Sequence, residues 1–537
     1  MTTAEAVVAG LYANGIDTLF CLPGVQNDEF FAALYAYRDR IRLIHTRHEQ
    51  GAAYMALGAA MSTGKPAAYC VVPGPGFLNS TGALCTAYAC NAPVLALTSQ
   101  IPQAYIGRGL GFLHELPDQL GVMQRLTKWA ERIREPQDAI PLVNEAFRQM
   151  TTGRPRPAGL ECPLDVWRQS AEIHVEPPAA SGAAVIDLPA VRRAAQLLRG
   201  AQRPLMVVGG GAQHAGDRVT AIAEQFQMPV IAGQMGFGVI DSRNPLSVNL
   251  QVGLKLWADA DVVLAIGTRL QIEQMVWGLD DRLKIIRVDI DPDEIERFRT
   301  PAVGILGDSR VVLDALLAEL ETGERAAVSQ VERIAQSRRA FAQESAYLQP
   351  QLAFLEALRA AIPEHGIFVD EVTQIGHAAR FGYPVYHPRT FISPGYQGTL
   401  GWGLATAIGV KVARPDRPVV SISGDGGFMF NVQELATAVL HDVPLVAVVF
   451  DDGAYGNVLR AQQLDYGNRV HASRLANPDF VKLAESFGIR AETVEGPRAL
   501  HDALVRAIAG NKLEVIHVPV GPMPDLWKFV RQGRVRG

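Results

Sequence analysis

Several features that define common protein classes are absent from this sequence of 537 residues. Its five cysteines form no CxxC pair, which predicts reduced thiols rather than a disulfide framework or a zinc site. It has no run of basic residues and a formal net charge of −5, which argues against nucleic acid or a membrane surface as a partner. No apolar run approaches the ~20 residues that cross a bilayer. The N-terminus lacks the basic start and cleavage site of a signal peptide. We therefore expect a cytoplasmic protein.

The length and the distribution of apolar segments predict the fold class. A chain of 58.1 kDa is too long for one hydrophobic core. Short apolar strands alternate with helical stretches in three blocks, the pattern of parallel α/β sheets. A linker rich in Pro and Ala (176–190) and a charged helical stretch (321–344) separate the blocks. We expect an α/β fold with three doubly wound parallel-sheet domains in series, over 1–170, 185–320 and 350–537.

Two acidic turns follow neighbouring apolar strands in the third block. "SISGDGG" (421–427) contains Asp425 between glycines, and "VAVVFDDGAYGNV" (446–458) contains Asp451 and Asp452. Glycines let backbone N–H groups approach an anion, and a following helix adds a favourable dipole. An acid in such a turn would repel phosphate unless a cation lay between them, so Asp425 is either a helix cap or a magnesium ligand. Asp452 lies 27 positions later, where the next parallel strand ends, and this favours the magnesium site.

GDG followed about 27 residues later by a polar pair resembles the signature of thiamine diphosphate (ThDP) enzymes. The order of the three blocks resembles the acetolactate synthase and 2-oxo-acid decarboxylase group over essentially the whole chain. The resemblance implies that Asp425, the Asp452 side chain and the backbone carbonyl of Ala454 bind Mg²⁺. The family usually has Asn-Asn where this chain has Asp451-Asp452. Asp offers the same ligating oxygen, so we expect coordination to survive, with Asp451 as structural support.

The resemblance also implies which residues contact the cofactor. Glu49, in "IHTRHEQGAAYMALGAA" (44–60), resembles the glutamate that hydrogen-bonds the aminopyrimidine ring and promotes its imino tautomer. That role needs an acid in a dry cleft, where burial raises its pKa. Leu400 falls where the family keeps the apolar wedge that bends the cofactor into a V. The other implied contacts are Pro73, Asn79, Glu371, Val372, Gln374, Gln397, Gly398, Gly424, Gly426, Gly427, Tyr455, Gly456, Asn457 and Val458.

The substrate pocket departs from the acetolactate synthase pattern. By the resemblance, Gln26 and His114 face the pocket, and His114 is either an acid or base on a bound carbonyl or a hydrogen-bonded structural histidine. Gln100 is expected near the same pocket. The arginine tied to the acceptor carboxylate is replaced by Glu273 in "GTRLQIEQ" (267–274), and a tryptophan that favours the larger acceptor is replaced by Ala461. Both residues that the resemblance assigns to binding of the acceptor substrate are therefore missing.

Two further expectations concern ligands and assembly. Segments at 209–211, 267–269 and 288–295 resemble a flavin site, so the middle block binds FAD, another adenine nucleotide or nothing. In these families the first block of one subunit faces the third block of another. The resemblance therefore implies a homodimer as the minimum unit, with a homotetramer expected. The C-terminal stretch 521–533 is either a lid anchored by Trp527 or packing.

The leading interpretation is a ThDP- and Mg²⁺-dependent enzyme acting on a small-molecule 2-oxo acid or 1,2-dicarbonyl. Cleavage or decarboxylation through a C2 ylide would leave an enamine, which acetolactate-synthase-like carboligation adds to an acceptor carbonyl. A simple 2-oxo-acid decarboxylase or a diketone-cleaving lyase is the near alternative. The same motifs are also compatible with a flavin-dependent enzyme of the pyruvate oxidase type and with a non-catalytic ThDP-fold subunit. The sequence does not name the substrate.

Overall fold

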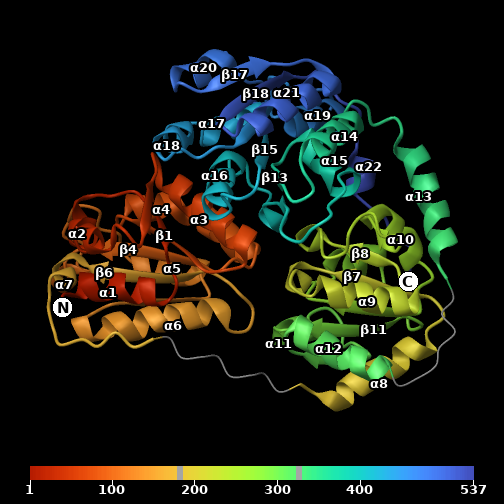
Figure 1. Ribbon diagram of the computed structural model, residues 1–537, viewed down its shortest axis with the longest axis horizontal. Helices are drawn as coiled ribbons and strands as arrows, with labels where there is room; N and C mark the ends of the chain where they lie inside the picture. The colour runs from red at the N-terminus through yellow and green to blue at the C-terminus, as the bar shows by residue number, and fades with distance from the viewer. Residues whose placement is uncertain (178–185, 322–328) are drawn as a thin grey trace.

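The computed structural model describes residues 1–177, 186–321 and 329–537. Three parallel six-stranded sheets follow one another along the chain, each with its own helices (Figure 1). Their strands are mostly buried on both faces, as in sheets covered by helices on either side. The predicted α/β fold of three parallel sheets in series is confirmed.

The first sheet has the strand order β2-β1-β3-β4-β6-β5. The strands are β1 (Thr18–Cys21), β2 (Arg42–His45), β3 (Ala67–Val71), β4 (Val94–Gln100), β5 (Trp129–Arg132) and β6 (Ala158–Pro163). The helices are α1 (Thr3–Ala13), α2 (Asp28–Leu34), α3 (Glu49–Thr63), α4 (Pro75–Ala89), α5 (Gln119–Leu126), α6 (Ala139–Thr151) and α7 (Leu164–Trp167). The chain order reverses between β1 and β3, so the loops after these strands flank a crevice of the kind where α/β proteins bind ligands.

The central sheet has the order β12-β11-β10-β7-β8-β9. The strands are β7 (Pro204–Val208), β8 (Val230–Ala232), β9 (Ser247–Val248), β10 (Val262–Ile266), β11 (Lys284–Asp289) and β12 (Val303–Leu306). The helices are α8 (Leu188–Gly200), α9 (Gly216–Phe226), α10 (Leu250–Trp257), α11 (Pro292–Ile295) and α12 (Ser309–Leu320). Here the chain order reverses between β7 and β10.

The third sheet has the order β14-β13-β15-β16-β18-β17. The strands are β13 (Ile367–Val369), β14 (Phe391–Ile392), β15 (Val419–Gly424), β16 (Val446–Asp451), β17 (Arg490–Thr493) and β18 (Glu514–Pro519). The helices are α13 (Val331–Ser345), α14 (Gln351–Ala361), α15 (Gln374–Gly382), α16 (Gly403–Ala413), α17 (Asp425–Phe430), α18 (Glu434–Leu440), α19 (Gly456–Leu464), α20 (Phe480–Ser486), α21 (Gly496–Gly510) and α22 (Trp527–Val530). The order reverses between β13 and β15, which places the turn around Asp425 at the switch point.

Helices α3 and α16 join the first domain to the third (Figure 1). Gly58 of α3 lies against the backbone of Thr406, and Gly409 of α16 lies against the backbone of Met55. A side chain at either glycine would overlap the facing helix, so glycine permits this close approach. The first and third domains therefore pack closely against each other through α3, the helix that begins with Glu49.

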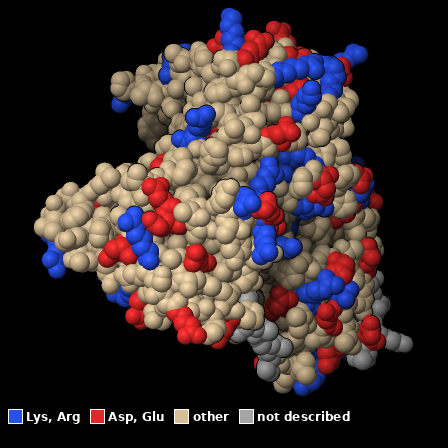
Figure 2. All heavy atoms as spheres, turned by 60° about the vertical axis from the view of Figure 1, so that its left-hand side comes forward, with Lys and Arg blue, Asp and Glu red and all other residues tan. Residues whose placement is uncertain are grey.

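The chain ends on the central domain, beside α10 (Figure 1). Arg536 is buried there and donates to the carbonyl oxygens of Ala258 and Ala260, so the C-terminal segment ties the third domain to the central one. On the face drawn in Figure 2, basic and acidic side chains are interspersed. No helix within the described residues is both long and apolar enough to span a membrane.

Candidate active site

A cavity of about 730 Å³ opens at the carboxyl ends of the strands of the third sheet. Among the described residues, those that line it lie between Val372 and Met523. The predicted residues in its lining are Val372, Gln374, Leu400, Gly424, Asp425, Gly426, Gly427, Asp452, Ala454, Tyr455, Gly456, Asn457 and Val458. The predicted residues outside its lining are Gln26, Glu49, Pro73, Asn79, His114, Glu371, Gln397 and Gly398.

Asp425 and Asp452 bring two carboxylates to this cavity. Asp425 is the first residue of α17, and Asp452 follows β16, which pairs with β15 in parallel. Burial raises the pKa of Asp425 to about 6, against a hydrogen bond from Asn477 that lowers it, and the negative charge of Asp452 adds to the rise. Burial also raises the pKa of Asp452, and the charge of Asp451 contributes. A cation between the two carboxylates would offset the cost of desolvating their negative charges and the repulsion between them.

Asp451 has a different environment from its neighbour. Its Oδ1 accepts from the backbone N–H of Gly453 (3.0 Å) and from Asn477 Nδ2 (2.8 Å), and its Oδ2 lies 3.2 Å from His517 Nε2. Asn477 Nδ2 also donates to Asp425 Oδ2 (2.7 Å). Asn477 therefore links the two acidic turns. It lies in an irregular loop before α20, where the sequence carries no periodic signal.

The glycine turn leaves no room for side chains. A Cβ on Gly426 would meet the Tyr455 ring at 2.7 Å, and a Cβ on Gly427 would overlap the Glu371 carboxylate. The Glu371 side chain is buried under this turn, where it accepts from the Gly401 N–H (2.7 Å) and from Ser423 Oγ (2.7 Å). Burial raises its pKa to about 7. Glu371 thus supports the turn from below, at the N-terminus of α17.

Polar and aromatic side chains form another wall of the cavity. Gln374 Nε2 lies 2.8 Å from Asn457 Oδ1, to which Arg460 donates at 2.8 Å. Arg460 also lies 3.7 Å from Asp525 and packs over the Trp527 ring, 5.7 Å from its centroid. The chain just before Asp525 lines the cavity itself, through Val520, Gly521, Pro522 and Met523. The C-terminal segment therefore covers one side of the cavity, and the sequence did not identify Arg460, Gln463 or Arg474 in its lining.

Glu49 lies at the carboxyl edge of the first sheet, outside this cavity. It begins α3, and its side chain is 12% exposed. Asn79 Nδ2 of α4 donates to Glu49 Oε2 (3.0 Å), and Gly76 in the first turn of α4 lies against the other carboxylate oxygen. Two of the predicted cofactor contacts, Glu49 and Asn79, are thus hydrogen-bonded to each other.

Gln26 and His114 lie together near the same edge. Gln26 Nε2 donates to the carbonyl oxygen of Leu113 (3.1 Å). Gln26 Oε1 and His114 Nδ1 are buried, and neither has a hydrogen-bond partner among the described residues. His114 has φ +65° and its backbone lies against Gly74, in the turn that follows Pro73. Two polar atoms with no partner in the described chain are available to a ligand at this edge.

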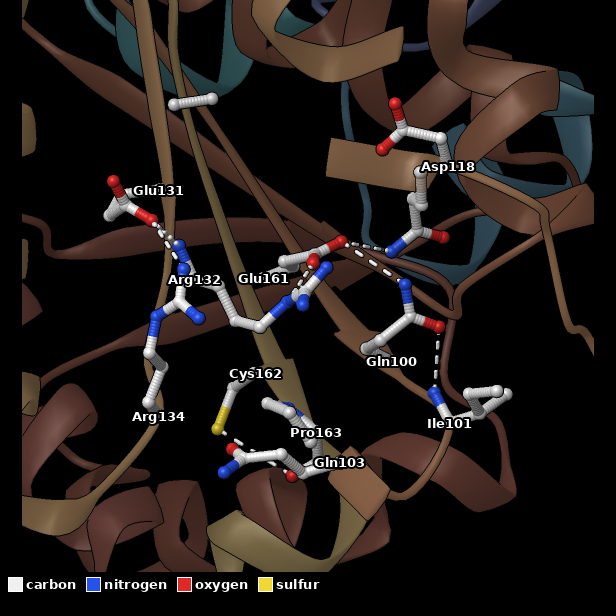
Figure 3. Close-up of polar contacts among 12 residues, drawn as sticks. Gln100, Ile101, Gln103, Asp118, Glu131, Arg132, Arg134, Glu161, Cys162 and Pro163 are labelled. Atoms are coloured by element: carbon white, nitrogen blue, oxygen red, sulfur yellow. Dashed lines mark hydrogen bonds and ion pairs between the residues drawn. The ribbon is translucent and has the colours of Figure 1, made fainter. Parts of the chain in front are cut away.

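A buried carboxylate, Glu161, lies between Arg132 and Gln100 (Figure 3) and is linked through Gln119 to the turn at Gly74. Glu161 of β6 is fully buried and pairs with Arg132, and its Oε2 accepts from Gln119 Nε2 (2.8 Å) and Gln100 Nε2 (3.3 Å). Gln119 Oε1 in turn accepts from the Gly74 N–H (2.7 Å). The side-chain amide of Gln100, expected near the pocket, belongs to this supporting network.

In the central domain, the two glycine turns at the switch point contact each other. The Gly211 N–H donates to the Gly267 carbonyl (3.1 Å), and Arg287 donates to the Thr268 carbonyl (2.7 Å). Glu273, where the resemblance has its acceptor arginine, is 5% exposed in a short π-helix. Burial raises the pKa of Glu273 to about 7. A flavin or another adenine nucleotide in this domain stays a prediction of the sequence.

Family models of thiamine pyrophosphate enzymes match the three parts of the chain in turn. The N-terminal TPP binding domain matches residues 1–122, the central domain 191–316 and the C-terminal TPP binding domain 371–518. The chain belongs to the thiamine diphosphate enzymes. Both halves of the candidate site lie on the domains described as TPP-binding, so the resemblance noted from the sequence is confirmed.

The curated relatives of this ThDP enzyme belong to the group that the sequence indicated. A probable 2-ketoarginine decarboxylase of Pseudomonas aeruginosa is 34% identical over 506 residues, covering 91% of this chain and 88% of its own. A probable acetolactate synthase large subunit of Methanocaldococcus jannaschii is 33% identical, covering 100% and 94%. The acetolactate synthase isozyme 1 large subunit of Escherichia coli is 30% identical, covering 99% and 96%. The chain is thus similar both to a decarboxylase and to carboligases.

Proposed function

We propose that this ThDP enzyme requires Mg²⁺ and cleaves the carboxylate from a 2-oxo acid. The observation that supports the proposal most directly is the placement of two carboxylates, buried Asp425 and exposed Asp452, beside a glycine turn in one cavity. Oxygen ligands suit Mg²⁺, and a glycine turn that opens a helix suits a diphosphate.

The residues present fit the metal and the cofactor. Asp425, Asp452 and the Ala454 carbonyl supply three oxygen ligands, and diphosphate and water oxygens would complete an octahedron. No group of three or more His, Cys, Asp and Glu side chains is arranged for a metal in the described parts of the chain, so this set depends on the carbonyl and the cofactor. Leu400 lines the same cavity, as an apolar support under the two rings requires.

When bound, ThDP supplies a nucleophilic carbon and an electron sink for the cleaved bond. The chain's part is to hold and move protons around it. Glu49, hydrogen-bonded to Asn79, would share its proton with the aminopyrimidine, and His114 would hold or deliver a proton at the substrate carbonyl. Because Glu49 does not line the cavity of its own chain, a second subunit would supply it. We therefore propose a homodimer as the minimum active unit, assembled further into a homotetramer.

The absence of the arginine and the tryptophan that the resemblance assigns to an acceptor favours protonation of the cleaved product over addition to a second carbonyl. Glu273 and Ala461 stand in their places, and neither lines the cavity. Decarboxylation followed by protonation is redox-neutral, so this reaction needs no flavin. Acetolactate-synthase-like carboligation is the second candidate, supported by the similarity to acetolactate synthase large subunits over nearly the full chain.

Calorimetry with ThDP and Mg²⁺, followed by product mass spectrometry on a panel of 2-oxo acids and 1,2-diketones, tests the proposal. We expect ThDP to bind only with a divalent cation, and Asp425→Ala to abolish that binding. Exposed Glu332, which pairs with Arg339 on the surface, gives a matched control in Glu332→Ala. An aldehyde as the only organic product supports decarboxylation, and a hydroxy-ketone supports carboligation. Absence of ThDP binding to the wild-type protein contradicts the proposal.

A further inference from the structure

A fully buried carboxylate of the third domain binds the backbone of the first domain next to Glu49. Glu434 is the first residue of α18 and is 0% exposed. Its Oε1 accepts from the His48 N–H (3.0 Å), and its Oε2 accepts from the Arg47 N–H (3.2 Å) and from Thr437 Oγ1 (2.6 Å). Two of the three donors are thus the backbone groups that immediately precede Glu49 in the chain.

These bonds hold the point at which α3 begins. His48 is the N-cap of α3, and its Nδ1 accepts from the Gln50 N–H (3.1 Å). In the same turn, a Cβ on Gly51 would meet this same oxygen, Glu434 Oε1, at 2.5 Å. Glu434 therefore fills the space against the first turn of α3 and satisfies two N–H groups that otherwise would be left unpaired there. The direction in which the Glu49 side chain leaves the helix depends on this turn.

The same segment of the third domain also contains a proposed metal ligand. Asp425 begins α17, and α18 with Glu434 follows after three residues. Asn431 in that connection donates to the carbonyl oxygen of Gly401, the neighbour of Leu400. Residues 425–434 therefore contact the cavity at one end and the first turn of α3 at the other.

We propose that Glu434 is a positioning residue for Glu49. The inference rests on the proposed function, in which the Glu49 of one subunit serves the cofactor of its partner. In that dimer, residues 425–434 bind the metal of their own subunit's cavity through Asp425 and, through Glu434, orient the Glu49 that acts in the partner's cavity. Glu434 thus acts on an active site other than the one its own domain contains.

Exchange of the ThDP C2 proton for deuterium, followed by NMR, measures the step that depends on Glu49. Glu434→Gln keeps the size of the side chain but turns an N–H₂ group toward one of the two backbone donors. We expect exchange to slow by about tenfold or more, while ThDP affinity changes by less than about threefold. Thr437→Val removes the third donor and leaves the bonds to Arg47 and His48, so its exchange rate should stay near that of wild type. An unchanged exchange rate in Glu434→Gln, or an equal loss in cofactor affinity, would overturn the proposal.

Mixed dimers decide which active site Glu434 serves. In the first, one subunit carries both Glu49→Gln and Glu434→Gln and the other is wild type. The wild-type Glu49 is then held by a wild-type Glu434 and works in the variant's cavity, so about half of the activity should remain. In the second, one subunit carries Glu49→Gln and the other Glu434→Gln. The only intact Glu49 is then misplaced, so activity should fall well below half.

The reverse pattern, in which the second dimer is the more active one, would show that Glu434 acts on its own cavity and would overturn the proposal. Equal activities would also overturn it. Failure of the proposed function has a different signature. In that case the wild-type protein binds no ThDP, or Glu49→Gln exchanges the C2 proton as fast as wild type does.

Discussion

Glu273→Gln should make the protein's stability less dependent on pH. Glu273 is 5% exposed, and burial raises the pKa of its carboxyl from the usual 4.5 to about 7. Each unit of pKa corresponds to about 1.4 kcal/mol, so the ionised carboxylate destabilises the folded state by about 3 kcal/mol. The folded pKa lies above the unfolded one. The stabilising effect of the neutral form is therefore complete below about pH 4.5 and is lost as the pH rises through about 7. Glutamine does not titrate and escapes this loss.

Urea unfolding of wild type and Glu273→Gln at about pH 5 and about pH 8 tests this reasoning. The stability of the variant relative to wild type should rise between the two pH values by about 2 to 3 kcal/mol. Glu332→Gln, on the exposed face of α13, is the matched control and should show no such change. Parallel pH profiles for wild type and Glu273→Gln would refute the argument. Because Glu273 does not line the cavity, we also expect kcat/KM of the variant to stay within about twofold of wild type.

Three further predictions concern the site and its support. Asp452→Asn keeps a ligating oxygen and should leave Mg²⁺ and ThDP affinities nearly unchanged by calorimetry, whereas Asp452→Ala should lower both; a collapse in the Asn variant would mean that the negative charge itself is needed. Glu161→Gln leaves half-buried Arg132 without a charged partner and should lower the free energy of unfolding by about 3 kcal/mol in urea titrations, so an unchanged value would rule out a stabilising ion pair there. Trp527→Ala removes the ring that packs against Arg460 and should raise KM more than it lowers kcat in steady-state assays. A change in kcat alone would show that this ring does not help to hold the substrate.

The acidic turns of the third domain were predictable because each depends on local sequence. A buried parallel strand reads as an apolar run, and the glycine that ends it marks the turn. β15 and β16 are neighbours in the sheet as well as in the chain, so Asp425 and Asp452 come together without any long-range information. Their placement in one cavity follows from the parallel pairing of these two neighbouring strands.

Side chains that act across domains were not predictable in this way. Glu434 reads as an ordinary helix residue, yet its acceptors bind N–H groups 386 and 387 positions away in the chain. Asn477 reads as a loop residue and bridges two carboxylates. Their partners depend on how α3 packs against α16 and on the path of an irregular loop, neither of which has a local pattern.

The sequence by itself determined the fold class, the ThDP family and the two turns that meet at the third sheet, because strand periodicity and glycine turns are local properties of the chain. Only the tertiary structure decided that Glu49 lies outside the cavity of the third domain, that Glu434 accepts from the two N–H groups just before Glu49, that Glu371 is buried beneath the glycine turn, and that Glu273 is buried in the central domain. The physical reason is that burial and hydrogen-bond partners depend on which domain surfaces meet, and a residue's type and spacing do not specify that contact.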